Sequence, residues 1–131
     1  MATTPIQVPE PGTVGDRWRR SRVITASAET GNTVELIEIP AGTYVAEVAI
    51  IILVALAGGT PSIDVGDDDA AAGWIATADI TETSAGSYRS TAATYAKNGR
   101  YYTAKKRISA ALSASLSAGS FIVCCRCIDL P

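Results

Sequence analysis

The stretch Tyr44–Leu56 reads YVAEVAIIILVAL and is the longest apolar run in the sequence, interrupted only by Glu47. Its β-branched residues favour a long strand over a helix, and the turn-forming residues Gly58-Gly59-Thr60-Pro61 end it. Because apolar residues occupy both parities of the run, we expect one face of this strand in the domain core and the other in a subunit interface. The residues assigned to this core and interface strand are Tyr44, Val48, Ile50, Ile52 and Val54.

Shorter strand patterns, separated by turn residues about every ten positions, lie on both sides of this run. The expected strands are Arg22–Ala26, Thr33–Ile39, Ser62–Val65, Lys106–Leu116 and Ser120–Leu130. The alternation in Thr33–Ile39 is imperfect at Leu36 and Ile37, and the alanine content of Lys106–Leu116 leaves a helix open there. Asn98-Gly99, ahead of Arg100, is typical of a β-hairpin turn. The pattern predicts an all-β fold, an antiparallel β-sandwich or jelly-roll.

The N-terminal residues form a separate part of the sequence. Pro5, Pro9 and Pro11 favour extended backbone and leave too few apolar residues for a core. We therefore expect residues 1–15 to be an extended N-terminal arm, disordered or laid along a neighbouring surface, and residues 16–131 to be a single β-sandwich domain.

Composition excludes most catalytic chemistry. The 131 residues carry a net charge of −2, only 18% charged residues and no histidine, so the commonest general base and metal ligand is missing. No phosphate-binding loop or Gly-x-Ser-x-Gly motif is present. We expect no enzymatic activity, no cofactor and no metal. The sequence also has no secretory signal pattern and no apolar run of about 20 residues, so we expect no membrane contact.

The three cysteines, Cys124, Cys125 and Cys127, lie close together in the last predicted strand. Strand parity places Cys125 and Cys127 on one face and Cys124 on the other. Zinc would need a fourth ligand, which neither a histidine nor another cysteine can provide. We therefore interpret these residues as small, reduced thiols that pack in the core.

Two other groups of residues allow a functional and a structural interpretation. Asp64 and Asp67–Asp69 offer clustered carboxylates for a cation, but their spacing does not match an EF-hand and a solvated turn is favoured. The residues Tyr95, Arg100, Tyr101 and Tyr102 resemble an aromatic patch for sugar stacking, although Tyr101 and Tyr102 must face opposite ways on a strand.

The main basic cluster is the segment Asp16–Arg22, DRWRRSR. A slightly acidic chain is unusual for a nucleic-acid module, so we expect no nucleic-acid partner. The remaining interpretations are docking on an acidic protein surface and protection of an exposed strand edge by charge. The candidate docking residues are Arg17, Trp18, Arg19, Arg20 and Arg22.

The middle of the sequence resembles a known class of proteins. The pattern begins with Val48-Ala49-Ile50-Ile51 and the segment from Gly58 to Asp67, GGTPSIDVGD, and continues with Gly73-Trp74-Ile75, Ala78-Asp79 and Tyr101-Tyr102-Thr103-Ala104. It is similar to small structural proteins of tailed-bacteriophage virions, of the capsid-decoration or head-fibre type. The resemblance covers residues 36–123, and its motifs are turns and strands, with no catalytic residues.

The resemblance implies a β-sandwich protein of the virion, assembled in the host cytoplasm. It implies a capsid decoration or head-fibre-base protein, a homotrimer that binds the major capsid protein or other virion proteins. A neck or tail component is the first alternative, and a glycan- or receptor-binding virion module is the second.

Overall fold

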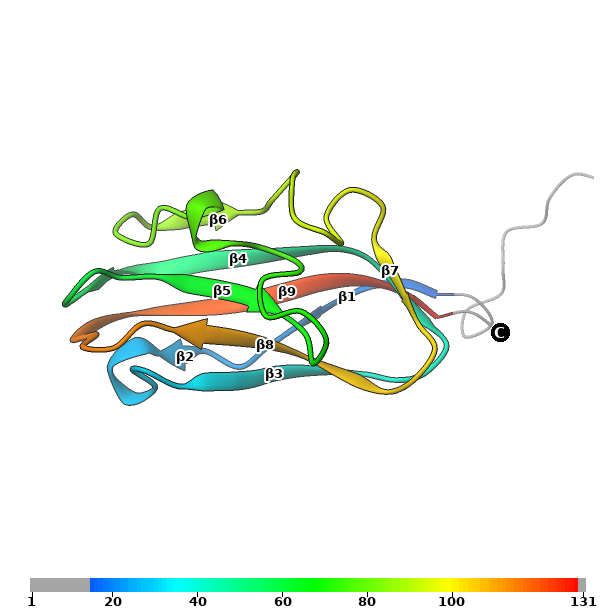
Figure 1. Ribbon diagram of the computed structural model, residues 1–131, viewed down its shortest axis with the longest axis horizontal. Coiled ribbons are helices and arrows are strands. Elements are labelled where there is room, and N and C mark those ends of the chain that lie inside the picture. The colour runs from blue at the N-terminus through cyan, green and yellow to red at the C-terminus, as the bar shows by residue number, and fades with distance from the viewer. Residues whose placement is uncertain (1–14, 130–131) are drawn as a thin grey trace, which may run out of the picture.

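The computed structural model describes residues 15–129, and their regular structure is almost entirely β-strand (Figure 1). The strands are β1 (Gly15–Arg20), β2 (Ile24–Thr25), β3 (Thr33–Ile39), β4 (Thr43–Ala57), β5 (Ile63–Gly66), β6 (Gly86–Tyr88), β7 (Arg100–Tyr102), β8 (Lys106–Leu112) and β9 (Ala118–Asp129). Two single 3-10 turns, η1 (Ala26–Ala28) and η2 (Thr77–Asp79), are the helices of this part of the chain. Neither is long or apolar enough to span a bilayer.

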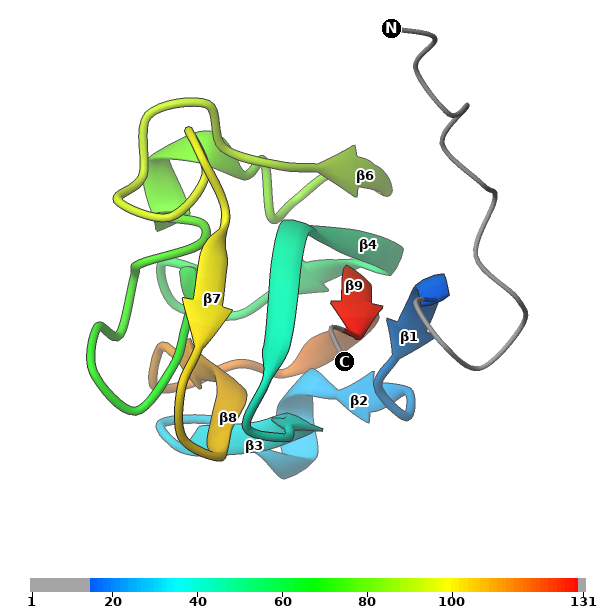
Figure 2. The same cartoon turned by 90° about the vertical axis from the view of Figure 1, so that its right-hand side faces the viewer.

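The strands form two antiparallel sheets. Sheet A has the order β1-β9-β4-β6, with β2 also paired to β9 and β7 also paired to β4, and sheet B has the order β3-β8-β5. Figure 2 shows β3 and β8 beneath β4 and β9, with the two sheets packed as layers. The predicted all-β fold and sandwich are confirmed, and the segment Lys106–Leu116, for which a helix was open, contains strand β8.

The core lies between the two sheets. Sheet A contributes Val48, Ile50 and Ile52 from β4 and alternate residues of β9, among them Phe121 and Val123. Sheet B covers them with alternating apolar residues of β3, β5 and β8, namely Val34, Ile37, Ile39, Ile63, Val65, Ile108, Ala110 and Leu112. Burial of each large side chain contributes about 1.5–3 kcal/mol, which makes this interface the main source of stability.

Bulges in β4 decide which of its apolar residues enter the core. The pairing with β9 shifts between Val45 and Glu47, between Ile52 and Val54, and between Val54 and Ala57. Each bulge adds one residue to β4 and so reverses the parity of the side chains that follow. Val54 lies between the last two shifts and is 57% exposed, so of the two roles expected for this strand it has no part in the core, and its place in a subunit interface stays a prediction. Val48, Ile50 and Ile52 face the core and are closed to a second subunit.

Other local expectations are corrected by the ladders. The strand predicted at Arg22–Ala26 is only the two-residue β2, because the chain pairs with β9 earlier, through β1, and then turns into η1. Asn98-Gly99 forms no hairpin, since β7 after it pairs with β4 and the preceding residues are a loop. A register shift between Glu35 and Ile37 explains the imperfect alternation of β3. The predicted arm lies outside the described residues except for Gly15, which begins β1.

Candidate functional site

The outward side of sheet A carries apolar side chains that no described element covers. Ile51 and Ile122 are partners across β4 and β9 and are half-buried. At the bulge beside them, Leu53 is 45% and Val54 is 57% exposed, and Trp18 on β1 is 55% exposed. We call this set, Trp18, Ile51, Leu53, Val54 and Ile122, the outer face. Apolar groups gathered on one sheet face are typical of a surface that binds another protein.

A row of charged residues crosses the same side of the sheet. Glu47 on β4 pairs with Arg126 Nε on β9 at 3.3 Å and with Arg89 Nη1, which follows β6, at 2.7 Å. Arg126 Nη1 in turn pairs with Asp16 Oδ2 on β1 at 3.2 Å. We call Asp16, Arg126, Glu47 and Arg89 the Glu47 row. Because its members are partly or largely exposed, each pair contributes about 0–1 kcal/mol to stability.

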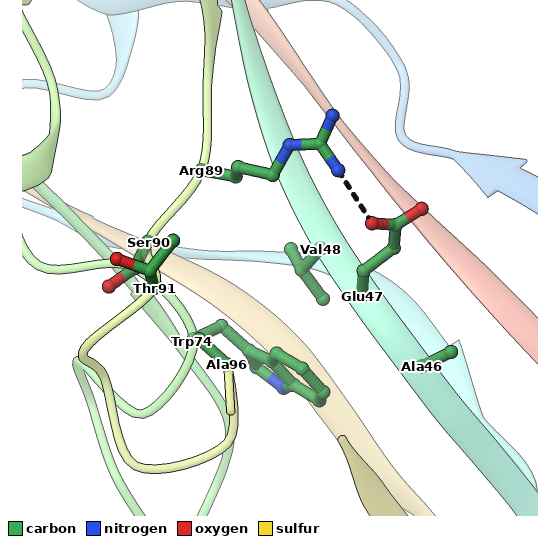
Figure 3. Close-up of a pocket in the computed structure, with 8 residues that line it drawn as sticks. All are labelled: Ala46, Glu47, Val48, Trp74, Arg89, Ser90, Thr91 and Ala96. Atoms are coloured by element: carbon green, nitrogen blue, oxygen red, sulfur yellow. Dashed lines mark hydrogen bonds and ion pairs between the residues drawn. The ribbon is translucent and has the colours of Figure 1, made fainter. Parts of the chain in front are cut away.

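A pocket of 230 Å³ adjoins the Glu47 row where the edge of β4 lacks a strand partner (Figure 3). Strand β6 pairs with Ile50–Ile52 and β7 with Thr43–Val45, which leaves Ala46–Ala49 between them. The pocket is lined by Ala46, Glu47, Val48, Trp74, Arg89, Ser90, Thr91 and Ala96. Its volume lies below the roughly 300–1,000 Å³ typical of small-molecule sites. It is large enough for one side chain of a partner protein.

Strand β1 divides the predicted docking cluster between two sides of the sheet. Arg17 and Arg19 lie beside Cys127 and Cys125 in the register with β9, and both guanidinium groups pair with Asp129. Trp18 and Arg20 take the alternate positions and are exposed. Arg22 follows β1 and lies 3.9 Å from Glu29. Because β1 ends the order of sheet A, the cluster lies on an edge strand, where charge also discourages unspecific pairing.

A buried ion pair is the feature that the sequence interpretation missed. The carboxylate of Asp67 is fully buried and accepts from Arg100 Nη1 at 2.5 Å and from Tyr102 Oη at 2.7 Å. Its other oxygen accepts from the backbone N–H of Asp69 and Ala70 at 2.9 and 3.0 Å. Arg100 also reaches Asp69 Oδ2 at 2.6 Å. With Tyr95, whose ring lies 4.7 Å from the guanidinium carbon of Arg100, these residues form what we call the Asp67 cluster.

The Asp67 cluster corrects two expectations. The favoured interpretation of the acidic turn as solvated is wrong for Asp67, because its carboxylate is fully buried and pairs with the Arg100 guanidinium. In residues 15–129 no three Cys, Asp or Glu side chains are placed to hold a metal ion. Tyr102 is 1% exposed and Tyr101 is 47% exposed, so the opposite orientations are confirmed and Tyr102 is closed to a sugar ring.

Burial and charge shift the protonation of the Asp67 cluster. Burial, then the hydrogen bond to Asp67, raises the pKa of Tyr102 above its usual value. Burial and the Asp67 charge also raise the pKa of Tyr95. Burial disfavours the charge on Arg100, but the carboxylates of Asp69 and Asp67 outweigh it and raise the pKa of Arg100. Tyr95, Tyr102 and Arg100 therefore all keep their protons at neutral pH, which suits a structural link and not a proton-transfer site.

The cysteines lie as their parity predicts. Cys125 and Cys127 are buried, Cys124 on the opposite face is half-buried, and all three are free thiols.

The fold is similar to chains in solved bacteriophage capsids. No family model and no curated protein matches the sequence. A chain of "Cyanophage Pam1 capsid asymmetric unit" matches with a TM-score of 0.63 at 17% identity, over 100% of this chain and 96% of that one. A chain of "Capsid of Ralstonia phage GP4" matches with 0.65 at 14% identity, over 96% and 92%. A chain of "Acidic stable capsid structure of Helicobacter pylori bacteriophage KHP30" matches with 0.62 at 14% identity, over 91% and 94%.

These similarities establish the fold, and they extend over nearly the full length of both partners in each case. The sequence resembles structural proteins of phage virions, and the three similar structures are phage capsids.

Proposed function

We propose that this protein is a structural component of a bacteriophage virion, and within the virion a capsid decoration protein or the base of a head fibre. The observation that carries the proposal is the near full-length match to chains of three phage capsids. The proposed activity is binding, without catalysis.

The surface of the molecule supports a role in assembly. The outer face presents apolar side chains that burial in an interface would remove from water, a gain of about 25 cal/mol per Å² of apolar area. The Glu47 row beside it alternates in sign, which sets the orientation of a partner more than it adds affinity. We propose that the assembled shell, through the major capsid protein or another virion protein, is the partner.

The proposed docking residues divide into two groups of different expected importance. Trp18 and Arg20 are exposed and available to a partner, whereas Arg17 and Arg19 already pair with Asp129. Aromatic and arginine side chains often dominate interface energies. We therefore expect Trp18 and Arg20 to contribute most to shell binding, and Arg22, which lies beside Glu29, to contribute less.

Rebinding to shells tests the proposed function. The gene is deleted from the genome that carries it, the particles are purified by density gradient, and the purified protein is added back. A decoration protein binds preassembled shells in many copies, and Trp18→Ala with Arg20→Ala reduces this occupancy strongly. The matched control is Arg107→Ala on β8, which is in sheet B and pairs with exposed Glu35. A failure of wild-type protein to bind such shells contradicts the proposed role.

The oligomeric state supplies a second test. We propose a homotrimer, assembled in the host cytoplasm before or during addition to the shell, with Val54 of the outer face and half-buried Tyr44 in the subunit contact. Light scattering on a sizing column measures the solution mass. A trimer that dissociates on Val54→Asp supports the contact, and a stable monomer at high concentration contradicts it.

Two alternatives predict different results in the same experiments. A neck or tail component forms a larger ring and enters the particle in few copies. A glycan- or receptor-binding virion module binds sugar saturably through exposed Tyr101, and Tyr101→Ala abolishes that binding while shell occupancy is unchanged.

A further inference from the structure

Near its end, β4 exposes two consecutive apolar side chains, Leu53 and Val54. In a regular strand that borders a core, one of two neighbouring residues faces inward. The register shifts that begin at Ile52 and at Val54 remove this alternation. Bulges of this kind often re-aim side chains for a purpose, so we treat Leu53 and Val54 as a unit and call them the β4 bulge.

The pocket beside the unpaired part of β4 has the complementary character. Val48 and Trp74 line it and are almost fully buried, so its floor is apolar. Arg89 and Glu47 pair with each other at its rim (Figure 3). The Arg89 side chain is 64% exposed, and an ion pair exposed to this degree contributes little, so the rim opens at small cost.

The β4 bulge and the pocket cannot meet within one molecule. Val54 follows Val48 by six positions on the same strand, which is about 20 Å at the rise of an extended chain. Both sites border the outer side of sheet A, the bulge as part of the outer face and the pocket through Glu47. An exposed apolar side chain and a pocket with room for one side chain can therefore cover each other only between two copies of the chain.

We propose that Val54 of one copy inserts into the pocket of a second copy, with Leu53 packed beside it. The proposal rests on the assembly role given above and supplies the subunit contact of the proposed homotrimer. Because two different surfaces meet, the contact is head-to-tail, and three such contacts close a ring. Each copy then gives one β4 bulge and receives another, which removes both sites from water.

The distribution of charge favours this pairing. Residues 50–57 of β4 carry no charge, and neither do residues 86–88 and 118–122, which pair with them. The β4 bulge therefore brings no charge to the pocket, where Glu47 and Arg89 already neutralise each other. An apolar centre with paired charges at its margin is the usual anatomy of a protein interface.

A mixing experiment tests the contact. The double substitution Leu53→Ser, Val54→Ser removes the bulge and keeps the pocket, whereas Ala96→Leu fills the pocket and keeps the bulge. By light scattering on a sizing column, we expect the wild type to be a trimer and each variant alone a monomer. An equal mixture of the two variants regains one bulge and one pocket that fit, so it forms a species of twice the monomer mass.

Each variant has a matched control. Val23→Ser replaces an apolar residue of similar exposure outside the β4 bulge, and Ala92→Leu adds the same side chain at an exposed position of the loop that contains Ala96. Both controls are expected to keep the wild-type mass. Circular dichroism establishes that every variant is folded, and Ala46→Leu fills the pocket from β4 if Ala96→Leu does not fold.

Three results overturn the proposed contact: a monomeric wild type, a trimer that persists in the folded pocket variant, or a mixture that keeps the monomer mass. Shell rebinding with the same proteins separates this contact from the proposed function. A wild type that is monomeric yet occupies shells overturns the contact alone. A wild type that fails to bind shells contradicts the proposed function whatever its mass in solution.

Discussion

The Asp67 cluster and the Glu47 row both join segments that are distant in the sequence, yet they differ in their exposure to water. Asp67 is fully buried, has four hydrogen-bond donors at 3.0 Å or less and lies beside the rings of Tyr95 and Tyr102. In the Glu47 row, the Arg89 side chain is 64% exposed. The two groups contain similar numbers of charges but have different roles. The Asp67 cluster fixes the conformation of two loops, whereas the Glu47 row lies on the surface and stabilises the fold little.

The largest expected effect comes from removing the buried carboxylate. Asp67→Ala leaves Arg100 and the hydroxyl of Tyr102 without their buried acceptor, so we expect a loss of about 3–5 kcal/mol of unfolding free energy. Denaturant unfolding measures it. The neighbouring Asp68→Ala is the control, since Asp68 is exposed, and it changes stability by less than about 0.5 kcal/mol. Equal effects of the two substitutions contradict the comparison.

Removal of a single hydroxyl sharpens the comparison within the Asp67 cluster. Tyr102 Oη donates to Asp67 and accepts from Trp74 Nε1 at 3.1 Å. Tyr102→Phe keeps the ring but leaves the indole N–H unpartnered, at an expected cost of about 1–3 kcal/mol. The exposed neighbour gives the control, because Tyr101→Phe is expected to change the unfolding midpoint little.

Alkaline pH weakens the buried cluster. The raised pKa of Tyr102, caused by burial and by the bond to Asp67, means that the unfolded chain releases this proton at about pH 10 while the folded chain retains it. Stability is therefore complete below that pH and falls as the pH rises above it, by up to about 1.4 kcal/mol per pH unit for this group. Denaturant unfolding on either side of pH ~10 measures the slope. We expect this slope to be shallower in Tyr102→Phe. An unchanged slope would show that another group causes the loss of stability at alkaline pH.

The smallest effect is expected in the Glu47 row. Glu47→Gln removes the charge that pairs with Arg126 and Arg89, and we expect a loss below about 1 kcal/mol that shrinks at high salt. Unfolding at two salt concentrations checks this. A loss as large as that of Asp67→Ala would show that the exposed row stabilises the fold as strongly as the buried cluster.

The sequence predicts what depends on local pattern. The long run of β4, the alternation in β8 and the facing of Cys125 and Cys127 follow from strand periodicity and composition. The exposure of Val54 does not, because it depends on bulges in the register with a strand far along the chain.

The Asp67 cluster shows the same limit at the level of the site. Asp67 and Arg100 are separated by 33 positions, and each has an ordinary local explanation, as a turn residue and as part of an aromatic patch. Only the packing of β7 against β4, near the loop that follows β5, brings them together. Docking by Trp18 and Arg20 stays a prediction, since it depends on a surface supplied by another protein.

The position of β9 in sheet A bears on how the chain acquires its fold during synthesis. It is central in sheet A, paired with β1, β2 and β4, yet it comes later in the chain than all three. During synthesis on the ribosome, the apolar strand β4 is made about sixty residues before β9, the strand with which it pairs over most of its length. Without β9, sheet A would keep only the pairing of β4 with the short strands β6 and β7, and β1 and β2 would have no strand partner, so the outer face forms only once β9 is in place. Until then β4 exposes apolar surface and an unpaired edge, the kind of segment that makes incompletely folded chains prone to aggregate.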